Sequence, residues 1–196
     1  YDISCNGYSD GGIDLNVTGS VPGYLYLWNT SDVTEDLSNL TEGTYSVGII
    51  DDNSCMISAS IILSEPTQLE ISIFPISDYN GYNISCNGYS DGSVSVSVNG
   101  SVPGYIYLWD NGEATLNAVS LSSGLQNVLV TDLNSCTIDT SIILSEPSPL
   151  QTSIVSAINY NSYDISCYGY SDGGIDLNVT GSVPGYVYLW STSDGT

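Results

Sequence analysis

The sequence predicts an all-β protein organised as a tandem array, on the strength of three observations. The chain repeats itself at a constant period, seen in the equal spacing of Trp28, Trp109 and Trp190. Apolar and polar residues alternate in short runs such as Ile-Asp-Leu-Asn-Val-Thr at 13–18, which is typical of a half-buried strand. Cysteine, tryptophan and cysteine follow one another in the first two repeats, the order found in immunoglobulin domains. We therefore expect immunoglobulin-like β-sandwich domains of about 81 residues, each with one disulfide.

The domain boundaries are expected at two Ser-Glu-Pro segments, which end at Pro66 and Pro147. Residues 67–147 then form one complete immunoglobulin-like repeat. Residues 1–66 form a repeat that lacks its first strand, and residues 148–196 form the N-terminal part of a third. Short linkers that contain proline favour a stiff connection between such domains.

The first and third repeats are more alike than either is like the second. Residues 1–34 and 163–196 are identical at 30 of 34 positions, whereas residues 82–115 match 1–34 at 21 positions. This alternation indicates recent duplication, so we expect these residues to be a section of a longer array.

The five cysteines follow the same period. The spacing from Cys5 to Cys55 equals the spacing from Cys86 to Cys136. The simplest pairing is one bridge within each repeat, with the partner of Cys167 outside the chain. A bridge that closes such a loop contributes about 4 kcal/mol in the chain-entropy model and requires an oxidising compartment, which predicts a secreted protein. The alternative is a metal–thiolate site, which two distant cysteines without histidine fit poorly.

The composition excludes several classes of function. The chain has no Lys, Arg or His against 22 Asp plus Glu, for a formal charge of -22. Without cations it has no means of neutralising nucleic-acid phosphates or anionic lipid, and without histidine it has no Ser-His-Asp triad. No apolar run is long enough to insert into a membrane. We expect no enzymatic activity and no nucleic-acid partner.

A strand with two different faces follows each Pro-Gly pair. Its aromatic face carries the expected core residues Trp28, Trp109 and Trp190. Its other face is aliphatic in every repeat, and we interpret it as an assembly face through which chains associate into a filament; the alternative is that a loop of the same domain covers it. The aliphatic residues are Leu25, Leu27, Ile106, Leu108, Val187 and Leu189.

Carboxylates near the cysteines are candidate calcium ligands, because a bridge within the repeat would bring the 6–12 loop beside the 51–54 turn. Turn-forming aspartate is the alternative interpretation, and no other cofactor is expected. The candidate ligands of a structural Ca²⁺ are Asp10, Asp51, Asp52, Asp91 and Asp132.

Two features are compatible with glycans. The 16 tyrosines include exposed rings that are either sugar-binding platforms or ordinary amphipathic surface. Six Asn-x-Ser/Thr sequences are candidate glycosylation sites, which would make the chain a glycoprotein. They begin at Asn16, Asn29, Asn39, Asn83, Asn99 and Asn178.

One sequence pattern resembles a known family. Cys-Asn-Gly-Tyr-Ser-Asp-Gly at 5–11 and 86–92 precedes an alternating strand, an aromatic-x-aromatic-x-Trp strand and a closing Gly-x-Tyr…Asp-x-Asn-x-Cys. This pattern resembles the SprB repeat, named for a surface adhesin of gliding Bacteroidota. The middle repeat departs from it at Gln126, which stands where the first has Tyr45.

The resemblance implies a long, secreted, surface-anchored protein used in adhesion, gliding motility or cell-surface filaments, without catalytic residues. We therefore expect a structural and adhesive segment of an extracellular filament. The alternative is an array of carbohydrate-binding immunoglobulin-like modules of a secreted protein.

Overall fold

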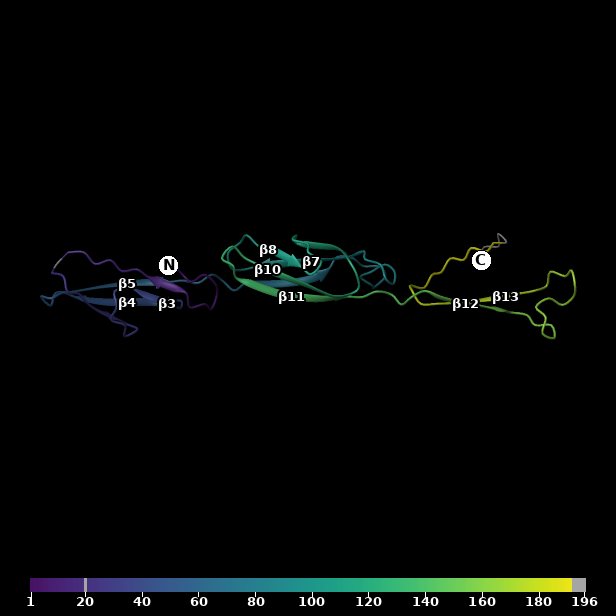
Figure 1. The fold of residues 1–196 in the computed structure, drawn as a ribbon, viewed down its shortest axis with the longest axis horizontal. Helices are drawn as coiled ribbons and strands as arrows, with labels where there is room; N and C mark the ends of the chain where they lie inside the picture. Colours follow the sequence, from purple (N-terminus) through teal and green to yellow (C-terminus); the bar gives the residue numbers. More distant parts are fainter. Residues whose placement is uncertain (20, 192–196) are drawn as a thin grey trace. The chain divides into compact units, whose positions relative to one another are not determined.

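The computed structural model describes residues 1–19 and 21–191, and this part of the chain contains thirteen strands and no helix (Figure 1). The expectation of an all-β protein is therefore confirmed. In chain order the strands are β1 (Gly11–Ile13), β2 (Leu25–Trp28), β3 (Leu37–Leu40), β4 (Gly43–Ile50), β5 (Met56–Leu63), β6 (Glu70–Pro75), β7 (Gly92–Asn99), β8 (Ile106–Trp109), β9 (Asn117–Leu121), β10 (Gly124–Thr131), β11 (Thr137–Leu144), β12 (Gln151–Ser156) and β13 (Ile175–Thr180).

The strands form five small sheets. Their orders are β1-β3, β2-β4-β5, β6-β7-β9, β11-β10-β8 and β12-β13. Strands β2, β4, β5 and β6 have counterparts β8, β10, β11 and β12, whose bounds lie one full period further along the chain. In the described residues no helix is long and apolar enough to cross a membrane.

The chain divides into two compact units, and the boundary between them runs through four strands. The first unit contains residues 1–72, 96–116 and 127–140, and the second contains residues 73–95, 117–126 and 141–196. The boundary passes through β6, β7, β10 and β11.

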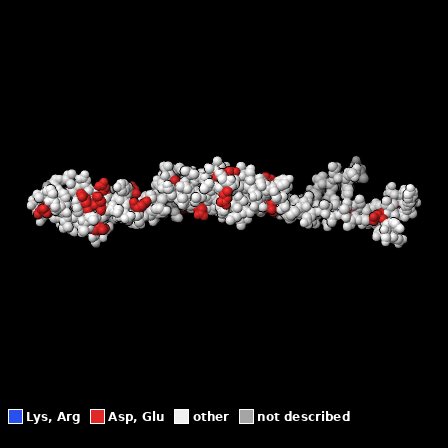
Figure 2. All heavy atoms as spheres, viewed as in Figure 1, with Lys and Arg blue, Asp and Glu red and all other residues white. Residues whose placement is uncertain are grey.

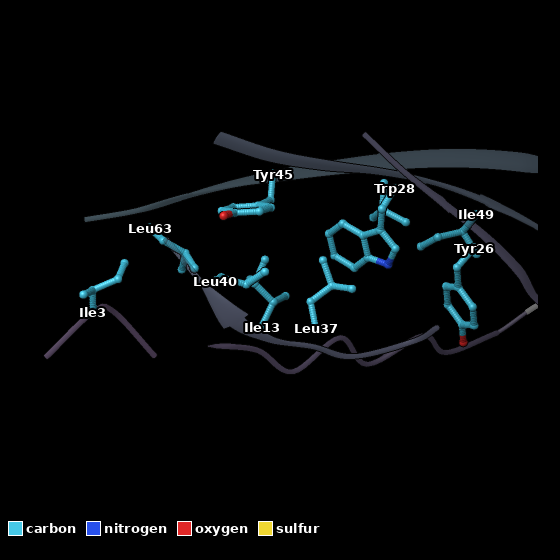
Figure 3. Close-up of a cluster of buried hydrophobic side chains, with 10 residues drawn as sticks. Ile3, Ile13, Tyr26, Trp28, Leu37, Leu40, Tyr45, Ile49 and Leu63 are labelled. Carbon is cyan, nitrogen blue, oxygen red and sulfur yellow. The ribbon is translucent and has the colours of Figure 1, made fainter. Parts of the chain in front are cut away.

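A hydrophobic core in the first unit lies between sheets β1-β3 and β2-β4-β5 (Figure 3). Tyr26 and Trp28 of β2 point into it, because alternate residues of a strand face opposite sides of the sheet. Leu37 and Leu40 of β3 meet them from the other sheet. This packing removes a large apolar area from water, at roughly 25 cal/mol per Å².

The core tryptophans are fixed by hydrogen bonds that recur along the chain. The indole N–H of Trp28 donates to the carbonyl oxygen of Thr34 at 2.8 Å, and that of Trp109 donates to Thr115 at 2.9 Å. A buried indole N–H without an acceptor would be costly, so each tryptophan also fixes the loop after its strand.

Gln126 replaces a tyrosine and keeps its hydrogen bond. The hydroxyl of Tyr45 donates to the carbonyl oxygen of Thr41 at 2.9 Å. In the middle repeat the side-chain amide of Gln126 donates to Ser122, also four residues back, at 3.0 Å. The departure from the family pattern therefore changes the donor and preserves the turn.

The C-terminal strands pair but have little cover. Strands β12 and β13 are antiparallel from Gln151 opposite Thr180 to Ser156 opposite Ile175. Ile175 is 62% exposed, whereas Val94, at the same position of the middle repeat, is fully buried. Two strands alone offer no second layer against which an apolar face can pack.

Two glycines give a matched test of backbone packing. Gly100 and its counterpart Gly19 both have a left-handed φ, of 82° and 88°. A β-carbon at Gly100 would overlap the carbonyl oxygen of Gln68, whereas one at Gly19 would meet nothing within 4 Å. We expect Gly19→Ala to cost about 1–2 kcal/mol from backbone strain alone, and Gly100→Ala to cost about 2 kcal/mol more. Urea denaturation measures both, and equal costs would contradict the close approach of Gln68.

Candidate functional site

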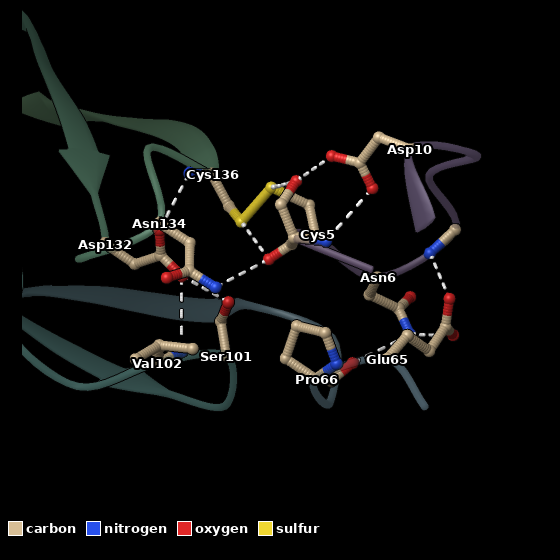
Figure 4. The surroundings of a disulfide bond; sticks show 12 residues. Cys5, Asn6, Asp10, Glu65, Pro66, Ser101, Val102, Asp132, Asn134 and Cys136 are labelled. Atoms are coloured by element: carbon tan, nitrogen blue, oxygen red, sulfur yellow. Dashed lines mark hydrogen bonds between the residues drawn. A yellow bond between two sulfur atoms is a disulfide. The ribbon is translucent and has the colours of Figure 1, made fainter. Parts of the chain in front are cut away.

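A disulfide joins the first repeat to the second (Figure 4). Cys5 is bonded to Cys136, 131 residues further along, with the two Cα atoms 5.7 Å apart. Cys55, Cys86 and Cys167 are free and exposed. The expected pairing of Cys5 with Cys55 and of Cys86 with Cys136 is therefore wrong, and the bridge lies between repeats.

The length of β5 explains why Cys5 does not bond to Cys55. Residues around Cys5 bind the C-terminal end of β5, since the amide of Ile3 donates to the carbonyl oxygen of Ser64 at 3.1 Å. Cys55 immediately precedes the N-terminal end of the same strand. An eight-residue strand spans about 27 Å, whereas the Cα atoms of a disulfide lie within about 7 Å.

The linker brings the second repeat to Cys5. Residue Pro66 follows the C-terminal end of β5, so the second repeat begins beside the Cys5 loop. Cys136 immediately precedes β11, the counterpart of β5. A further contact crosses the junction, because the side-chain amide of Asn134 donates to the carbonyl oxygen of Ser4 at 2.9 Å.

Asp132 organises the second repeat's side of this junction. Its carboxylate, only 3% exposed, accepts hydrogen bonds from the amide of Cys136 at 2.7 Å, the amide of Val102 at 3.2 Å and the hydroxyl of Ser101. Burial raises the pKa of Asp132, but the hydrogen bonds from Ser101, Val102 and Cys136 outweigh it, so that the pKa lies below its usual value. The charged carboxylate therefore holds Cys136 in place.

The loop after Cys5 binds the linker glutamate on the first repeat's side. Glu65 accepts hydrogen bonds from the side-chain amide of Asn6 at 2.6 Å and from the amide of Gly7 at 2.7 Å. The middle repeat has the same arrangement, because the amide of Gly88 donates to Glu146 at 2.6 Å. Each Ser-Glu-Pro segment is thus bound by the cysteine loop of its own repeat.

A serine–aspartate pair shapes each cysteine loop. Asp10 accepts hydrogen bonds from the hydroxyl and the amide of Ser4. Asp91 and Asp172 make the same bonds with Ser85 and Ser166, at the corresponding positions of the second and third repeats. The serine hydroxyl, and then the serine amide, lower the pKa of all three carboxyls.

The candidate calcium ligands serve their own turns. Asp51, 7% exposed, accepts hydrogen bonds from the amides of Asn53 and Cys55. The expected convergence of Asp10 with Asp51 and Asp52 depended on a Cys5–Cys55 bridge, which the structure does not contain. In the described residues no three carboxylates or thiols come together as a metal-binding group.

The expected assembly face is exposed in all three repeats. Tyr26 and Trp28 are buried, whereas Leu25 and Leu27 on the opposite side of β2 are 50% and 47% exposed. No loop of the same domain covers these aliphatic side chains in the described residues. The other four are also exposed: Ile106, Leu108, Val187 and Leu189.

The expected core tryptophans are buried in the two repeats that have a second layer. Trp28 and Trp109 are 6% and 2% exposed, and Trp190 is half-buried.

Of the candidate glycosylation sites, Asn83 is partly buried, and its side-chain oxygen accepts a hydrogen bond from the amide of Ser145. The five exposed sites are Asn16, Asn29, Asn39, Asn99 and Asn178.

Several residues of the junction gave no signal in the sequence. Ser4 and Ser101 are common polar residues, and Asn134 belongs to the recurring Asp-x-Asn-x-Cys sequence, but none of these local patterns predicts a role between repeats. Glu65 marked a domain boundary but not a hydrogen-bonded one. All four of these residues recur at the period of the array, and this recurrence was the only available sign that their side chains have fixed partners.

Recurring strands and a junction linked by a disulfide define a tandem-repeat β protein. Residues 1–33, 82–114 and 159–195 match the family model of the SprB repeat. These stretches cover more than half of the chain, which therefore belongs to the SprB repeat family, as its cysteine-loop and tryptophan patterns predicted. The comparison with curated proteins finds no match.

Digestion without reduction tests the cysteine pairing. The chain has no Lys or Arg for trypsin, but a glutamate-specific protease cuts after Glu35, Glu42, Glu70 and Glu113 and spares the Glu-Pro bonds. We expect fragment 1–35 to be linked to fragment 114–196. If mass spectrometry finds fragment 1–35 linked to fragment 43–70 instead, the cysteines pair within the repeat and the bridge between repeats is contradicted.

Removing the bridge should destabilise the junction. We expect Cys136→Ser to lower the free energy of unfolding by up to about 5 kcal/mol, because the bridge closes a loop with a sequence separation of 131. Cys86→Ser is the matched control, since Cys86 is free and its loss should change little. Chemical denaturation compares the two, and an equal loss of stability would count against the bridge.

Acid should weaken the structure through its hydrogen-bonded aspartates. The pKa values of Asp10, Asp91 and Asp132 are lowered on folding, so their stabilisation is complete above the unfolded value of about 3.9 and is lost as the pH falls through the folded values. We expect the free energy of unfolding to be level from about pH 7 to 5 and to fall below about pH 4. Asp132→Asn should lose stability at pH 7 and flatten this fall, while Asp139→Asn, at an exposed site, should do neither.

Proposed function

We propose that this chain is a structural and adhesive segment of a long secreted cell-surface protein, and that its repeats assemble laterally into an extracellular filament. Membership of the SprB repeat family supports a cell-surface repeat protein. The observation that carries the proposal of assembly is the pair of exposed aliphatic side chains at the same place in each repeat. Adhesion and gliding are the activities that such a filament would serve.

The exposed aliphatic pairs suit contact between protein chains better than contact with water. Leu25 and Leu27 alternate along β2 with the buried Tyr26 and Trp28, so they occupy one face of a regular strand. The neighbouring strands extend that face, because Leu25 lies opposite Ile50, which lies opposite Met56. Exposed apolar side chains that adjoin one another mark surfaces at which proteins associate.

The charge of the chain favours a contact made by apolar groups. Asp and Glu lie in small separate groups on the face seen in Figure 2, and the chain has no cation to pair with them. Two copies therefore have no salt bridges to form with each other. Their net charge opposes random aggregation, so association depends on close packing of the aliphatic face.

We also propose that each repeat is an immunoglobulin-like sandwich and that its strands carry mechanical load. The two-sheet core of the first unit supports this interpretation. Strands β4 and β5 pair along their whole length, from Gly43 opposite Leu63 to Ile50 opposite Met56, so they resist separation through a long ladder. Glycans on exposed sites such as Asn16 and Asn99 would further protect an extracellular surface.

Charged substitutions on the aliphatic face test the proposal. We expect Ile106→Asp with Leu108→Asp to abolish lateral packing, because two carboxylates would have to be buried without partners. Negative-stain microscopy and light scattering measure filament width and mass. Filaments of unchanged width would overturn the proposed face.

A matched control adds the same charge elsewhere. Gln151 and Ser153 are exposed polar residues of β12, and the middle repeat already carries Glu70 at the position of Gln151. We expect Gln151→Asp with Ser153→Asp to leave the filaments intact. Equal disruption by both double variants would mean that net charge, rather than the aliphatic face, controls assembly.

The second candidate function, a carbohydrate-binding array, is favoured by one recurring feature. Tyr8, Tyr89 and Tyr170 occupy the same position of the cysteine loop and are 54%, 58% and 61% exposed. Exposed aromatic rings can stack on sugar rings. Isolated soluble chains that bind a glycan array, and that lose binding after Tyr89→Ala, would favour this function over the filament.

A further inference from the structure

We propose that the bond between repeats recurs along the array with the stagger of Cys5 and Cys136, so that the first cysteine of every repeat is bonded to the second cysteine of the next. Under this rule Cys55 bonds to the first cysteine of another repeat, and Cys86 bonds to the second cysteine of another repeat. The inference rests on the proposed structural role of the array. It adds a covalent linkage between repeats that the family match does not describe.

The turn that holds Cys55 has the same hydrogen bonds as the turn that holds the bonded Cys136. The carboxylate of Asp51 accepts the amide of Cys55 at 2.7 Å, and that of Asp132 accepts the amide of Cys136 at 2.7 Å. The backbone closes the two turns alike, because the amides of Asp51 and Asp132 donate to the carbonyl oxygens of these cysteines at 3.1 and 2.9 Å. The turn of Cys136 therefore holds a cysteine in a disulfide, and the equivalent turn of Cys55 holds a free, exposed thiol.

The hollow beside Cys55 lacks the linker and cysteine-loop residues that line the hollow beside Cys136. A hollow of about 200 Å³ next to Cys55 is lined by Val17, Gly19, Tyr24 and Ile57. In the second repeat the linker residues Gln68 and Leu69 and the loop of Cys5 line the corresponding hollow. A β-carbon at Gly100 would overlap the carbonyl oxygen of Gln68, whereas one at its counterpart Gly19 would meet nothing within 4 Å. The hollow beside Cys55 thus lies where, beside Cys136, a linker and the cysteine loop that accompanies it are found.

The loop that holds Cys86 has hydrogen bonds equivalent to those of the loop that holds the bonded Cys5. The amide of Gly88 binds Glu146 as the amide of Gly7 binds Glu65. Ser85 likewise binds Asp91 as Ser4 binds Asp10. The two loops differ in that Cys5 has met the second cysteine of the following repeat, while Cys86 is free and exposed. The surroundings of Cys86 therefore match those of a cysteine already bonded across a junction.

Formation of each bond is an oxidation of two thiols. The two sulfur atoms join, and two protons and two electrons pass to an oxidant, which we take to be a protein disulfide that is reduced to a dithiol. Compartments outside the cytoplasm supply such oxidants. The reaction thus requires the extracellular location that the proposed function assigns.

The stagger gives the array a short covalent route that bypasses most of its chain. From Cys5 the route crosses the bridge to Cys136, follows the chain to Cys167 and crosses the next bridge, and so advances by two whole repeats. Because unfolding cannot lengthen a chain beyond its covalent route, reduction should increase the fully stretched length of an array about fivefold, at roughly 3.3–3.6 Å per residue. With pairing within each repeat, the covalent route would include the segment from Cys55 to Cys86 in every repeat instead of in every second one. Reduction would then increase the fully stretched length only about 2.6-fold.

A lengthened chain tests the rule. Residues 163–196 nearly duplicate residues 1–34, so a copy of residues 35–162 joined after residue 196 continues the sequence in its own order. The copy brings one further equivalent each of Cys55, Cys86 and Cys136. We expect Cys86 to bond to the copy of Cys55, and Cys167 to the copy of Cys136, under an oxidising glutathione buffer.

Thiol titration and non-reducing digestion give the outcome. Residues 1–196 alone should titrate with the three free thiols Cys55, Cys86 and Cys167. The lengthened chain should titrate with two, Cys55 and the copy of Cys86. No free thiol would mean pairing within repeats, and six would mean that Cys5–Cys136 is a single exception; either overturns the proposal.

Two controls keep the result clear. The Cys5–Cys136 bridge in the same digest shows that the lengthened chain has folded. Cys86→Ser should leave the copy of Cys55 as a free thiol without affecting the link from Cys167. Filament width, measured on the same sample, separates the two proposals, because filaments without the additional bridges would overturn the staggered linkage and leave the aliphatic assembly face standing.

Discussion

The length of the final strand of a repeat decides how consecutive repeats are joined. Strand β5 separates the loop of Cys5, bound at its C-terminal end, from Cys55, which precedes its N-terminal end. The two thiols of one repeat therefore cannot meet, while the linker delivers the next repeat to the end where Cys5 lies. The Cys5–Cys136 bridge, the Glu65 contacts and the Asn134 contact all follow from this arrangement.

A chain without cations must stabilise its carboxylates by other means. It uses hydroxyls and backbone amides: Ser4 for Asp10, Ser101 and Val102 for Asp132, and Asn6 and Gly7 for Glu65. Such hydrogen bonds lower the pKa of an aspartate as a cation would, and they also fix the backbone that supplies the donor. The acidic residues that matter most here are therefore parts of turns and linkers.

Covalent and apolar contacts would divide the work of a filament between two directions. The disulfide acts along the chain, between one repeat and the next, whereas the exposed aliphatic pairs lie on one face of β2 and β8. The bond is hard to break but needs an oxidising environment, and the apolar face needs only a complementary surface. A surface filament assembled in this way would resist stretching without any salt bridge.

Alternation by itself predicted the all-β class, the buried Trp28 and Trp109 and the aliphatic second face of their strands, because alternation along a strand is a local property that survives in any packing of the strands. The resemblance to the SprB repeat rested on the cysteine-loop and tryptophan motifs, and only the structure showed that the aliphatic faces are exposed. The disulfide partner was decided only by the tertiary structure. In a periodic sequence a pairing of Cys5 with Cys55 and a pairing of Cys5 with Cys136 are equally regular, so spacing cannot separate them. The role of Gln126 was likewise decided by the tertiary structure. Only the fold shows that its amide donates to a carbonyl oxygen four residues back, as the tyrosine hydroxyl does in the first repeat. Which groups meet depends on how far a strand carries the chain, and that distance exists only once the strand has formed.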